Sequence, residues 1–178
     1  HFTSTEAYRN RVIQLGEQPE RVFNVGALGV ENVMKNDFMS KEEIESSLNF
    51  QLTDKCLLCT YHPVTLSNMS SEVQVLNLLK ALDYYKDYHI IFTYSNSDTN
   101  SQIIIKRIQE YVDRNKGRCM FIPSLGQRRY FSALKYMTAV LGNSSSGIIE
   151  VPSFGIPTLD IGDRQKGRIA ADCVIHCG

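Results

Sequence analysis

The sequence comprises 178 residues, in which 19 lysine and arginine residues are balanced by 19 aspartate and glutamate residues. This balance argues against a dedicated nucleic-acid surface, so no nucleic-acid partner is expected. With 43% hydrophobic residues the chain can bury a sizeable core, and no apolar run approaches the roughly 20 residues of a membrane span. No segment has the pattern of a secretory leader, so we expect a cytoplasmic protein without a membrane partner.

The cysteines predict neither a metal site nor a disulfide framework. Two of the five, Cys56 and Cys59, have CxxC spacing, but they fall in an apolar run with the pattern of a strand. Residues i and i+3 of a strand point to opposite faces, so these two thiols cannot share one metal ion. We therefore expect reduced cysteines that mostly fill the core, and no cofactor.

Hydrophobic periodicity predicts strands alternating with helices along the chain. A first strand is expected over 21–25, and capping boxes are expected at Ser40 with Glu43 and at Ser71 with Gln74. Helical spacing follows within 75–85, 104–112 and 128–137, and a further helix begins in the serine cluster. The remaining strands are predicted over 55–61, 89–94, 118–122, 138–142, 157–162 and 172–176.

This alternation predicts an α/β fold, a Rossmann-like parallel sheet with helices on both faces. Ligands of such sheets bind at the carboxyl ends of the strands, so the informative residues are those that directly follow a strand. Five loops meet this condition, and they are expected to line one edge of the sheet: 62–63, 95–98, 123–129, 142–146 and 162–168.

The loop with the most distinctive composition is GNSSSGIIE, residues 142–150. Gly142 lets the backbone turn closely, and Ser144, Ser145 and Ser146 add hydroxyl donors to the free N–H groups at a helix start. Such a loop suits a phosphate, and Glu150 can accept two hydrogen bonds of the kind a ribose offers. The alternative is a plain serine N-cap followed by a capping-box acid, and residue types alone leave both open.

The other loops carry single candidates, each with a structural alternative. His62 follows a strand, a position that favours a site over a structural histidine. Asn96 is available to a ligand or to its own loop. Arg128 and Tyr130 lie at a helix start, where arginine needs an anionic partner or solvation. Arg164 lies in GDRQKGR, either a phosphate clamp or a solvated surface loop.

The stretch GNSSSGIIEVPSFGIPTLDIGDRQKGR, residues 142–168, closely resembles the bacterial UDP-N-acetylglucosamine 2-epimerases, especially the hydrolysing branch of sialic-acid and legionaminic-acid synthesis. TYHPVT at 60–65 and the segments 1–17 and 25–33 resemble the same family. The resemblance implies a glycosyltransferase-B-type fold of two Rossmann-like domains. Residues 1–36 would then be the tail of the N-terminal domain, and 37–178 the C-terminal UDP-binding domain, incomplete at its C-terminus.

The resemblance also implies roles on the nucleotide side. Ser144 and Ser145 would hold the diphosphate, and Glu150 would bind the ribose hydroxyls. Tyr130 occupies the family's aromatic position beside uracil, with Arg128 at a nearby position in a loop of variable length.

Three further residues follow from the same resemblance. Asn96 would contact the nucleotide, although SNSDTNS departs from the family's usual Pro-Asn-x-Asp-x-Gly. Arg164 would reach the phosphate or the sugar. His62 matches a histidine implicated in catalysis, near the sugar and the leaving group.

The implied reaction eliminates UDP from UDP-N-acetylglucosamine and hydrates the resulting glucal to N-acetylmannosamine. The family's acid/base carboxylates lie mainly in the N-terminal domain, so this chain by itself is expected to be inactive, and the full-length protein is expected to be a homo-oligomer. Three alternatives remain: a non-hydrolysing epimerase, a glycosyltransferase of the same architecture, and a flavodoxin-like binding module without catalysis.

Overall fold

The computed structural model describes residues 1–64, 69–94 and 101–178. Within it the chain forms two compact units, His1–Asn36 and Asp37–Gly178. No helix among the described residues is long and apolar enough to cross a bilayer.

The first unit is built from two very short strands and two helices. Strand β1 (Phe2–Thr3) pairs in parallel with β2 (Phe23–Asn24), helix α1 (Glu6–Gln14) connects them through the 3-10 turn η1 (Pro19–Arg21), and helix α2 (Leu28–Met34) follows. The strand expected over 21–25 is therefore shorter than predicted. The reason is that the 3-10 turn extends through Arg21, which leaves only two residues to pair.

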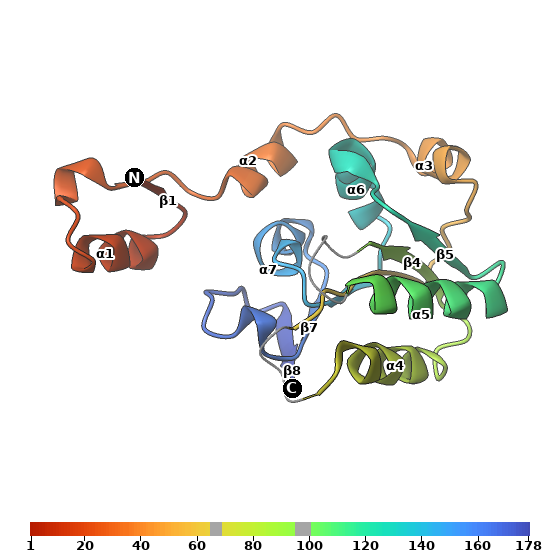
Figure 1. Ribbon diagram of the computed structural model, residues 1–178. Helices are drawn as coiled ribbons and strands as arrows, with labels where there is room; N and C mark the ends of the chain where they lie inside the picture. The colour runs from red at the N-terminus through yellow and green to blue at the C-terminus, as the bar shows by residue number, and fades with distance from the viewer. Residues whose placement is uncertain (65–68, 95–100) are drawn as a thin grey trace. The chain divides into compact units, whose positions relative to one another are not determined.

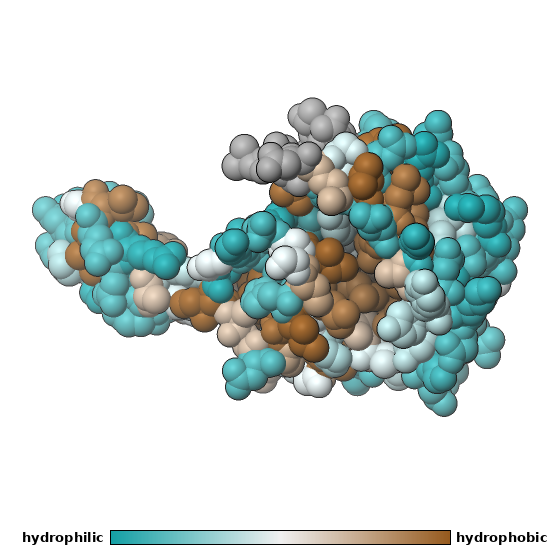
Figure 2. All heavy atoms as spheres, turned by 90° about the horizontal axis from the view of Figure 1, so that it is seen from below, coloured by the Kyte–Doolittle hydropathy of each residue, from teal (hydrophilic) through white to brown (hydrophobic). Residues whose placement is uncertain are grey.

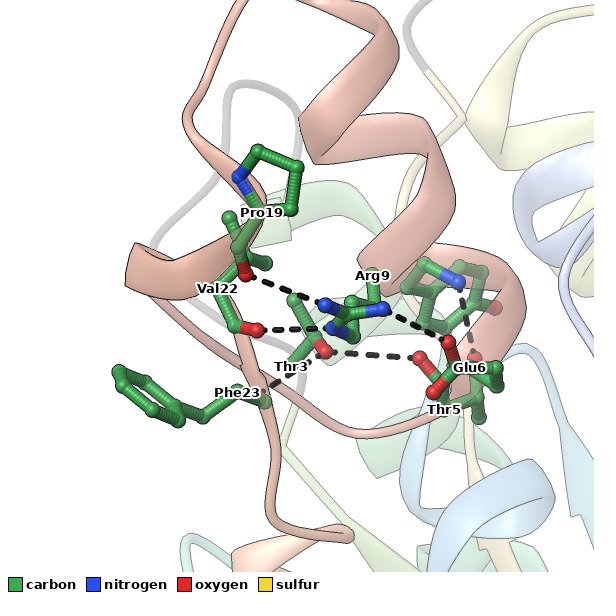
Figure 3. A network of polar contacts seen from close by, with 8 residues as sticks. Thr3, Thr5, Glu6, Arg9, Pro19, Val22 and Phe23 are labelled. Carbon is green, nitrogen blue, oxygen red and sulfur yellow. Dashed lines mark hydrogen bonds and ion pairs between the residues drawn. The ribbon is translucent and has the colours of Figure 1, made fainter.

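Arg9 joins the helix of this unit to its strand, as Figure 3 shows. Its guanidinium donates to the carbonyl of Val22 (2.8 Å) and to the carbonyl of Pro19 (3.1 Å), and it pairs with Glu6 one turn earlier on α1. The Thr5 hydroxyl caps the same helix by accepting from the Tyr8 N–H. These contacts hold a segment with few buried side chains in a defined local shape.

The second unit is a six-stranded sheet in which every neighbouring pair of strands is parallel, in the order β5-β4-β3-β6-β7-β8. Helices α4 and α5 lie on one side of the sheet and α3 and α6 on the other (Figure 1). This is the expected Rossmann-like parallel sheet. Its elements are α3 (Lys41–Leu48), β3 (Cys56–Thr60), α4 (Ser71–Leu82), β4 (His89–Thr93), α5 (Ser101–Arg114), β5 (Cys119–Ile122), α6 (Gly126–Leu134), β6 (Ala139–Gly142), α7 (Ser146–Ile149), η2 (Val151–Phe154), β7 (Thr158–Ile161), η3 (Asp163–Gln165) and β8 (Val174–Cys177).

One predicted capping box is confirmed and the other is wrong. Ser40 and Glu43 exchange the two expected bonds at the start of α3. At α4, however, the cap is Ser70, and Ser71 is already the first helical residue. Gln74 cannot close a box because its side chain accepts from the Tyr61 hydroxyl (2.9 Å) and donates to a loop carbonyl.

Strand β3 is the centre of the core and is buried on both faces, as its continuous apolar run predicts. Cys56 and Cys59, both at most 1% exposed, point to opposite faces of this strand. Burial raises the pKa of each thiol to about 12, so both stay protonated at neutral pH. They behave as small apolar core residues, and all five cysteines are free thiols.

The side of the sheet that α4 and α5 cover is hollowed next to α4. Leu141, Leu159 and Ile161 line a cavity of about 1020 Å³, with Leu78 and Tyr85 among the residues of its walls. Figure 2 shows the hydrophobic residues that gather in a hollow on this face. The opposite side of β6 and β7 packs against α7 and leads into the loops described below.

We expect Phe92→Ala to lower the free energy of unfolding by about 3–5 kcal/mol, because it empties a site in the middle of the core. Phe92 is fully buried on β4, and its ring meets Tyr111 edge-on at 6.0 Å. Tyr84→Ala, at an 82% exposed aromatic, is the control and should change stability by no more than about 0.5 kcal/mol. Urea unfolding measures both, and equal losses would contradict this account of the core.

Candidate functional site

The sheet has its topological switch point between β3 and β6. From β3 the chain moves outward through β4 and β5, then returns to the other side of β3 and continues through β6, β7 and β8. The loops after β3 and β6 therefore leave neighbouring strands in opposite directions, which is where parallel α/β sheets bind their ligands. His62 lies in the first of these loops and the serine cluster in the second.

Gly142 allows the two strands to pair up to their last residues. It has φ +127, and a Cβ at this position would lie 1.9 Å from the carbonyl oxygen of Thr60 on β3. Only glycine fits such a close approach of two backbones. The next residue, Asn143, donates its backbone N–H to the same Thr60 oxygen (3.2 Å), so the pairing continues into the loop.

The side chain of Asn143 binds the backbone of His62 through both ends of its amide. Its Oδ1 accepts from the His62 N–H (2.7 Å), and its Nδ2 donates to the His62 carbonyl (2.8 Å). Asn143 is fully buried and His62 is 5% exposed. The amide thus continues the hydrogen bonding between β3 and β6 beyond the last residues of both strands.

A third loop joins at the same residue. The carbonyl of Asn143 accepts from Arg164 (3.0 Å) and from the side chain of Gln165 (2.7 Å), both in η3 after β7. The expectation that His62, the serine loop and Arg164 meet at one sheet edge is therefore confirmed. Asn143 and Gln165 were not predicted. Asn143 carried a signal, since it is the first residue after a strand, but nothing in the sequence indicates that Gln165 is only 1% exposed.

The serine loop offers unused donors to this edge. Among the hydrogen bonds of the described residues, none is donated by the backbone N–H of Ser144, Ser145 or Ser146. No side chain caps α7, so the simple helix-cap interpretation of the serines does not describe this loop. Because α7 is a single turn, the attraction for an anion would come from these N–H groups and hydroxyls, with the Arg164 guanidinium nearby.

Tyr130, Ser146 and Glu150 form a chain beside the serine loop. The Tyr130 hydroxyl and the Ser146 hydroxyl lie 2.5 Å apart. Burial raises the pKa of Tyr130 to about 12, so the phenol stays protonated at neutral pH. Burial also raises the pKa of Glu150, against a lowering by the Ser146 hydroxyl, and its Oε2 is buried with no partner among the described residues. This oxygen is an acceptor without a donor.

Two candidate residues are not part of this cluster. Arg128 lies two positions from Tyr130 on α6, so the two side chains leave the helix about 200° apart. It donates to the backbone and to the carboxylate of Asp37, and it remains exposed. Asn96 lies outside the described residues. No group of three or more metal-ligating side chains is found in the described part of the chain.

Comparison with known proteins gives the family. The model of the family described as UDP-N-acetylglucosamine 2-epimerase matches residues 1–178, so the chain belongs to this family. A Campylobacter jejuni protein named GDP/UDP-N,N'-diacetylbacillosamine 2-epimerase (hydrolyzing) is 40% identical over 98% of the chain and 46% of its own length. The Escherichia coli polysialic acid biosynthesis protein P7 is 43% identical over 98% of the chain and 44% of its own length. The chain thus spans about half the length of these relatives.

Solved structures give the fold. The UDP-GlcNAc 2-epimerase of Methanocaldococcus jannaschii matches 99% of the chain with 50% of its own length, at a TM-score of 0.65 and 19% identity. The Neisseria meningitidis UDP-GlcNAc 2-epimerase bound to UDP-GlcNAc matches 98% of the chain with 47% of its own length, at a TM-score of 0.62 and 18% identity. The expected glycosyltransferase-B-type fold is thereby confirmed.

We expect Gly142→Ala to reduce stability by about 2–6 kcal/mol, because the new Cβ adds both overpacking against Thr60 and a strained backbone. Gly155→Ala is the matched control, since Gly155 also has a positive φ (+68) but no atom within 4 Å of the added carbon. Gly155→Ala should lose only about 1–2 kcal/mol of stability, the strain of a non-glycine residue at positive φ. Equal losses in urea unfolding would show that the β3–β6 approach does not need glycine.

Glu150 should make stability depend on pH. Burial holds the folded pKa of Glu150 above its ordinary value of 4.5, so between these two values the folded state binds more protons than the unfolded state. Stability is therefore lost as pH rises through this window, and Glu150→Gln should remove that loss. Urea unfolding at a series of pH values measures the difference, with the exposed Glu20→Gln as a control for a lost surface charge. Parallel curves for the wild type and Glu150→Gln would contradict the burial argument.

Proposed function

We propose that this chain is the UDP-binding half of a hydrolysing UDP-N-acetylglucosamine 2-epimerase. The observation that carries the proposal is the serine loop, in which three consecutive N–H groups donate to no other described residue and lie at the switch point beside the Arg164 guanidinium. This arrangement provides donors and positive charge for a diphosphate. The resemblance of residues 142–168 to this family supports the same assignment.

Ser144 and Ser145 would hold the diphosphate with their backbone N–H groups and hydroxyls, and Arg164 would add a charge-assisted bond. These groups would stabilise the charge on UDP as it departs from C1 of the sugar, the leaving-group task of the reaction. In this role the loop contributes to the transition state as well as to binding.

Glu150 would accept the ribose hydroxyls, which would supply the donor that its Oε2 lacks. Tyr130 would stand beside uracil, held by the Ser146 hydroxyl. Arg128 would reach the nucleotide only by leaving Asp37, so we expect it to contribute less than the other residues. Asn96 keeps its proposed contact with the nucleotide from the resemblance alone.

In the full-length protein we propose two Rossmann-like domains, with residues 1–36 as the tail of the first and 37–178 as the UDP-binding second. The coverage of only 44–46% of the relatives' length supports this arrangement. A base would take the C2 proton as the C1–O bond breaks and UDP leaves, and water would add H to C2 and OH to C1, giving N-acetylmannosamine. His62 would act near the sugar and the leaving oxygen.

The resemblance further leads us to propose a cytoplasmic homo-oligomer that supplies sialic-acid-type synthesis, and the name of the Escherichia coli relative supports that setting. A second candidate substrate is UDP-N,N'-diacetylbacillosamine. Two relatives, 40% and 35% identical, carry this sugar and the hydrolysing reaction in their names. The non-hydrolysing alternative is favoured by no particular residue described here, and the products distinguish it.

Calorimetric titration of this chain with UDP tests the binding half of the proposal. We expect weak binding of UDP. Glu150→Ala should make the binding free energy less favourable by about 1–3 kcal/mol, because a charged acceptor in a partly buried site is lost. Ser145→Ala should also weaken binding, whereas the exposed Ser153→Ala, in the adjacent turn, should not. Binding that both Glu150→Ala and Ser145→Ala leave unchanged would rule out the serine loop as the nucleotide site.

Product analysis on the full-length protein tests the reaction. Incubation with each UDP-sugar should release free UDP together with the free 2-epimeric sugar, and comparison of the two rates identifies the preferred sugar. A UDP-linked 2-epimer as product would establish the non-hydrolysing alternative. This chain without the remaining domain should release neither product, because it lacks the proposed acid/base carboxylates, and turnover by the chain alone would contradict our placement of those groups.

A further inference from the structure

The loops that would carry His62 and the diphosphate-binding serines are joined by a single side chain. Asn143 accepts from the N–H of His62 and donates to its carbonyl, at 2.7 and 2.8 Å, across 81 positions of sequence. Its own carbonyl is held by Arg164 and Gln165 at 3.0 and 2.7 Å. The loops after β3, β6 and β7 therefore meet at one residue that is fully buried.

An amide is the group that such a position requires. A side chain of this length must accept from one backbone group and donate to another at the same time, and asparagine does both without a charge. A leucine of similar size would remove both bonds that Asn143 makes to the N–H and the carbonyl of His62 in a buried site. An ionised aspartate would retain the accepted bond but would set a negative oxygen against the His62 carbonyl.

We propose that Asn143 is a positioning residue that fixes the distance and orientation of His62 relative to Ser144 and Ser145. This inference rests on the proposed function, in which His62 acts on the sugar and the serines hold the diphosphate. Ser144 and Ser145 follow Asn143 directly in the chain. The two hydrogen bonds from Asn143 to the His62 backbone therefore set the position of His62 relative to the diphosphate that the serines would hold. Gln165 in turn holds Asn143 in place.

The test compares Asn143→Asp with Asn143→Leu. An ionised carboxylate cannot donate to the His62 carbonyl, whereas a protonated carboxyl can, so acidification restores this hydrogen bond in Asn143→Asp only. Its hydroxyl can donate to the His62 carbonyl while its other oxygen accepts from the His62 N–H. We expect burial to raise the folded pKa of the introduced carboxyl above its ordinary value of about 3.9, against the Arg164 guanidinium and the His62 N–H, which both favour the ionised form. Among the described residues, the groups that hydrogen-bond Asn143 are the backbone of His62 and Thr60 and the side chains of Arg164 and Gln165, and only Arg164 carries a charge.

The first measurement is the stability of this chain as a function of pH, relative to the wild type. Asn143→Asp should be destabilised at neutral pH and should recover as pH falls through the folded pKa of the new carboxyl, because the folded state then binds the extra proton. Asn143→Leu should be destabilised by an amount that does not change with pH. If the stability of Asn143→Asp does not recover on acidification, Asn143 does not hold the two loops together through its hydrogen bonds to the His62 backbone.

The second measurement is turnover of the UDP-sugar by the full-length protein, as a ratio to wild type at each pH. Asn143→Leu should lower kcat about 100-fold, the effect of a displacement near 1 Å, with KM close to wild type. Asn143→Asp should show a similar loss at neutral pH and regain kcat on acidification. Recovery of stability without any change in kcat would reduce Asn143 to a structural residue and overturn its positioning role.

Gln165→Met keeps the inference testable if the Asn143 variants do not fold. It removes the donor to the Asn143 carbonyl at similar length, so kcat should fall by a smaller factor with KM unchanged, and an unaltered kcat would contradict the proposal. A wild-type protein that turns over neither UDP-sugar would refute the proposed function separately. In that case the pH recovery of stability still decides whether Asn143 holds the two loops together.

Discussion

The close pairing of β3 with β6 is the contact on which the rest of the site depends. These strands lie far apart in the sequence and meet at the switch point of the sheet, where Gly142 lets the two backbones approach to a distance that no side chain tolerates. Because the pairing runs to the last residue of each strand, the loops that follow begin side by side. A looser approach would separate them before either could contribute to a common site.

Polar groups at this edge fall into two sets. The amide of Asn143, the backbone of His62 and the donors of Arg164 and Gln165 satisfy one another inside the protein. The N–H groups of the serine loop, one oxygen of Glu150 and the side-chain oxygen of Gln165 do not find partners among the described residues. Satisfied buried networks rigidify a fold, whereas unsatisfied groups beside them are what a polar ligand can bind. The Asn143 network thus forms the support of the site, and the serine loop with Glu150 forms the surface that a ligand can contact.

Sequence reasoning succeeded where the signal is local. The continuous apolar run of β3, the helical spacing of α4 and α5 and the Ser40 capping box all depend on residues within one or two turns of each other. It failed for the second capping box because Gln74 bonds to Tyr61, 13 positions away and across a loop. Arg128 was grouped with Tyr130 by proximity in sequence, although their side chains leave the helix in different directions and Arg128 forms an ion pair with Asp37.

The sequence by itself determined the class of fold and the edge of the sheet at which a site would form. Strand–helix alternation requires a parallel sheet, and such a sheet gathers the residues after its strands. Only the tertiary structure decided which of those residues bind one another. The partners of Asn143 come from positions 21 or more residues away in either direction, and a pairing over such a distance depends on strand order and close backbone approach, which no local pattern encodes.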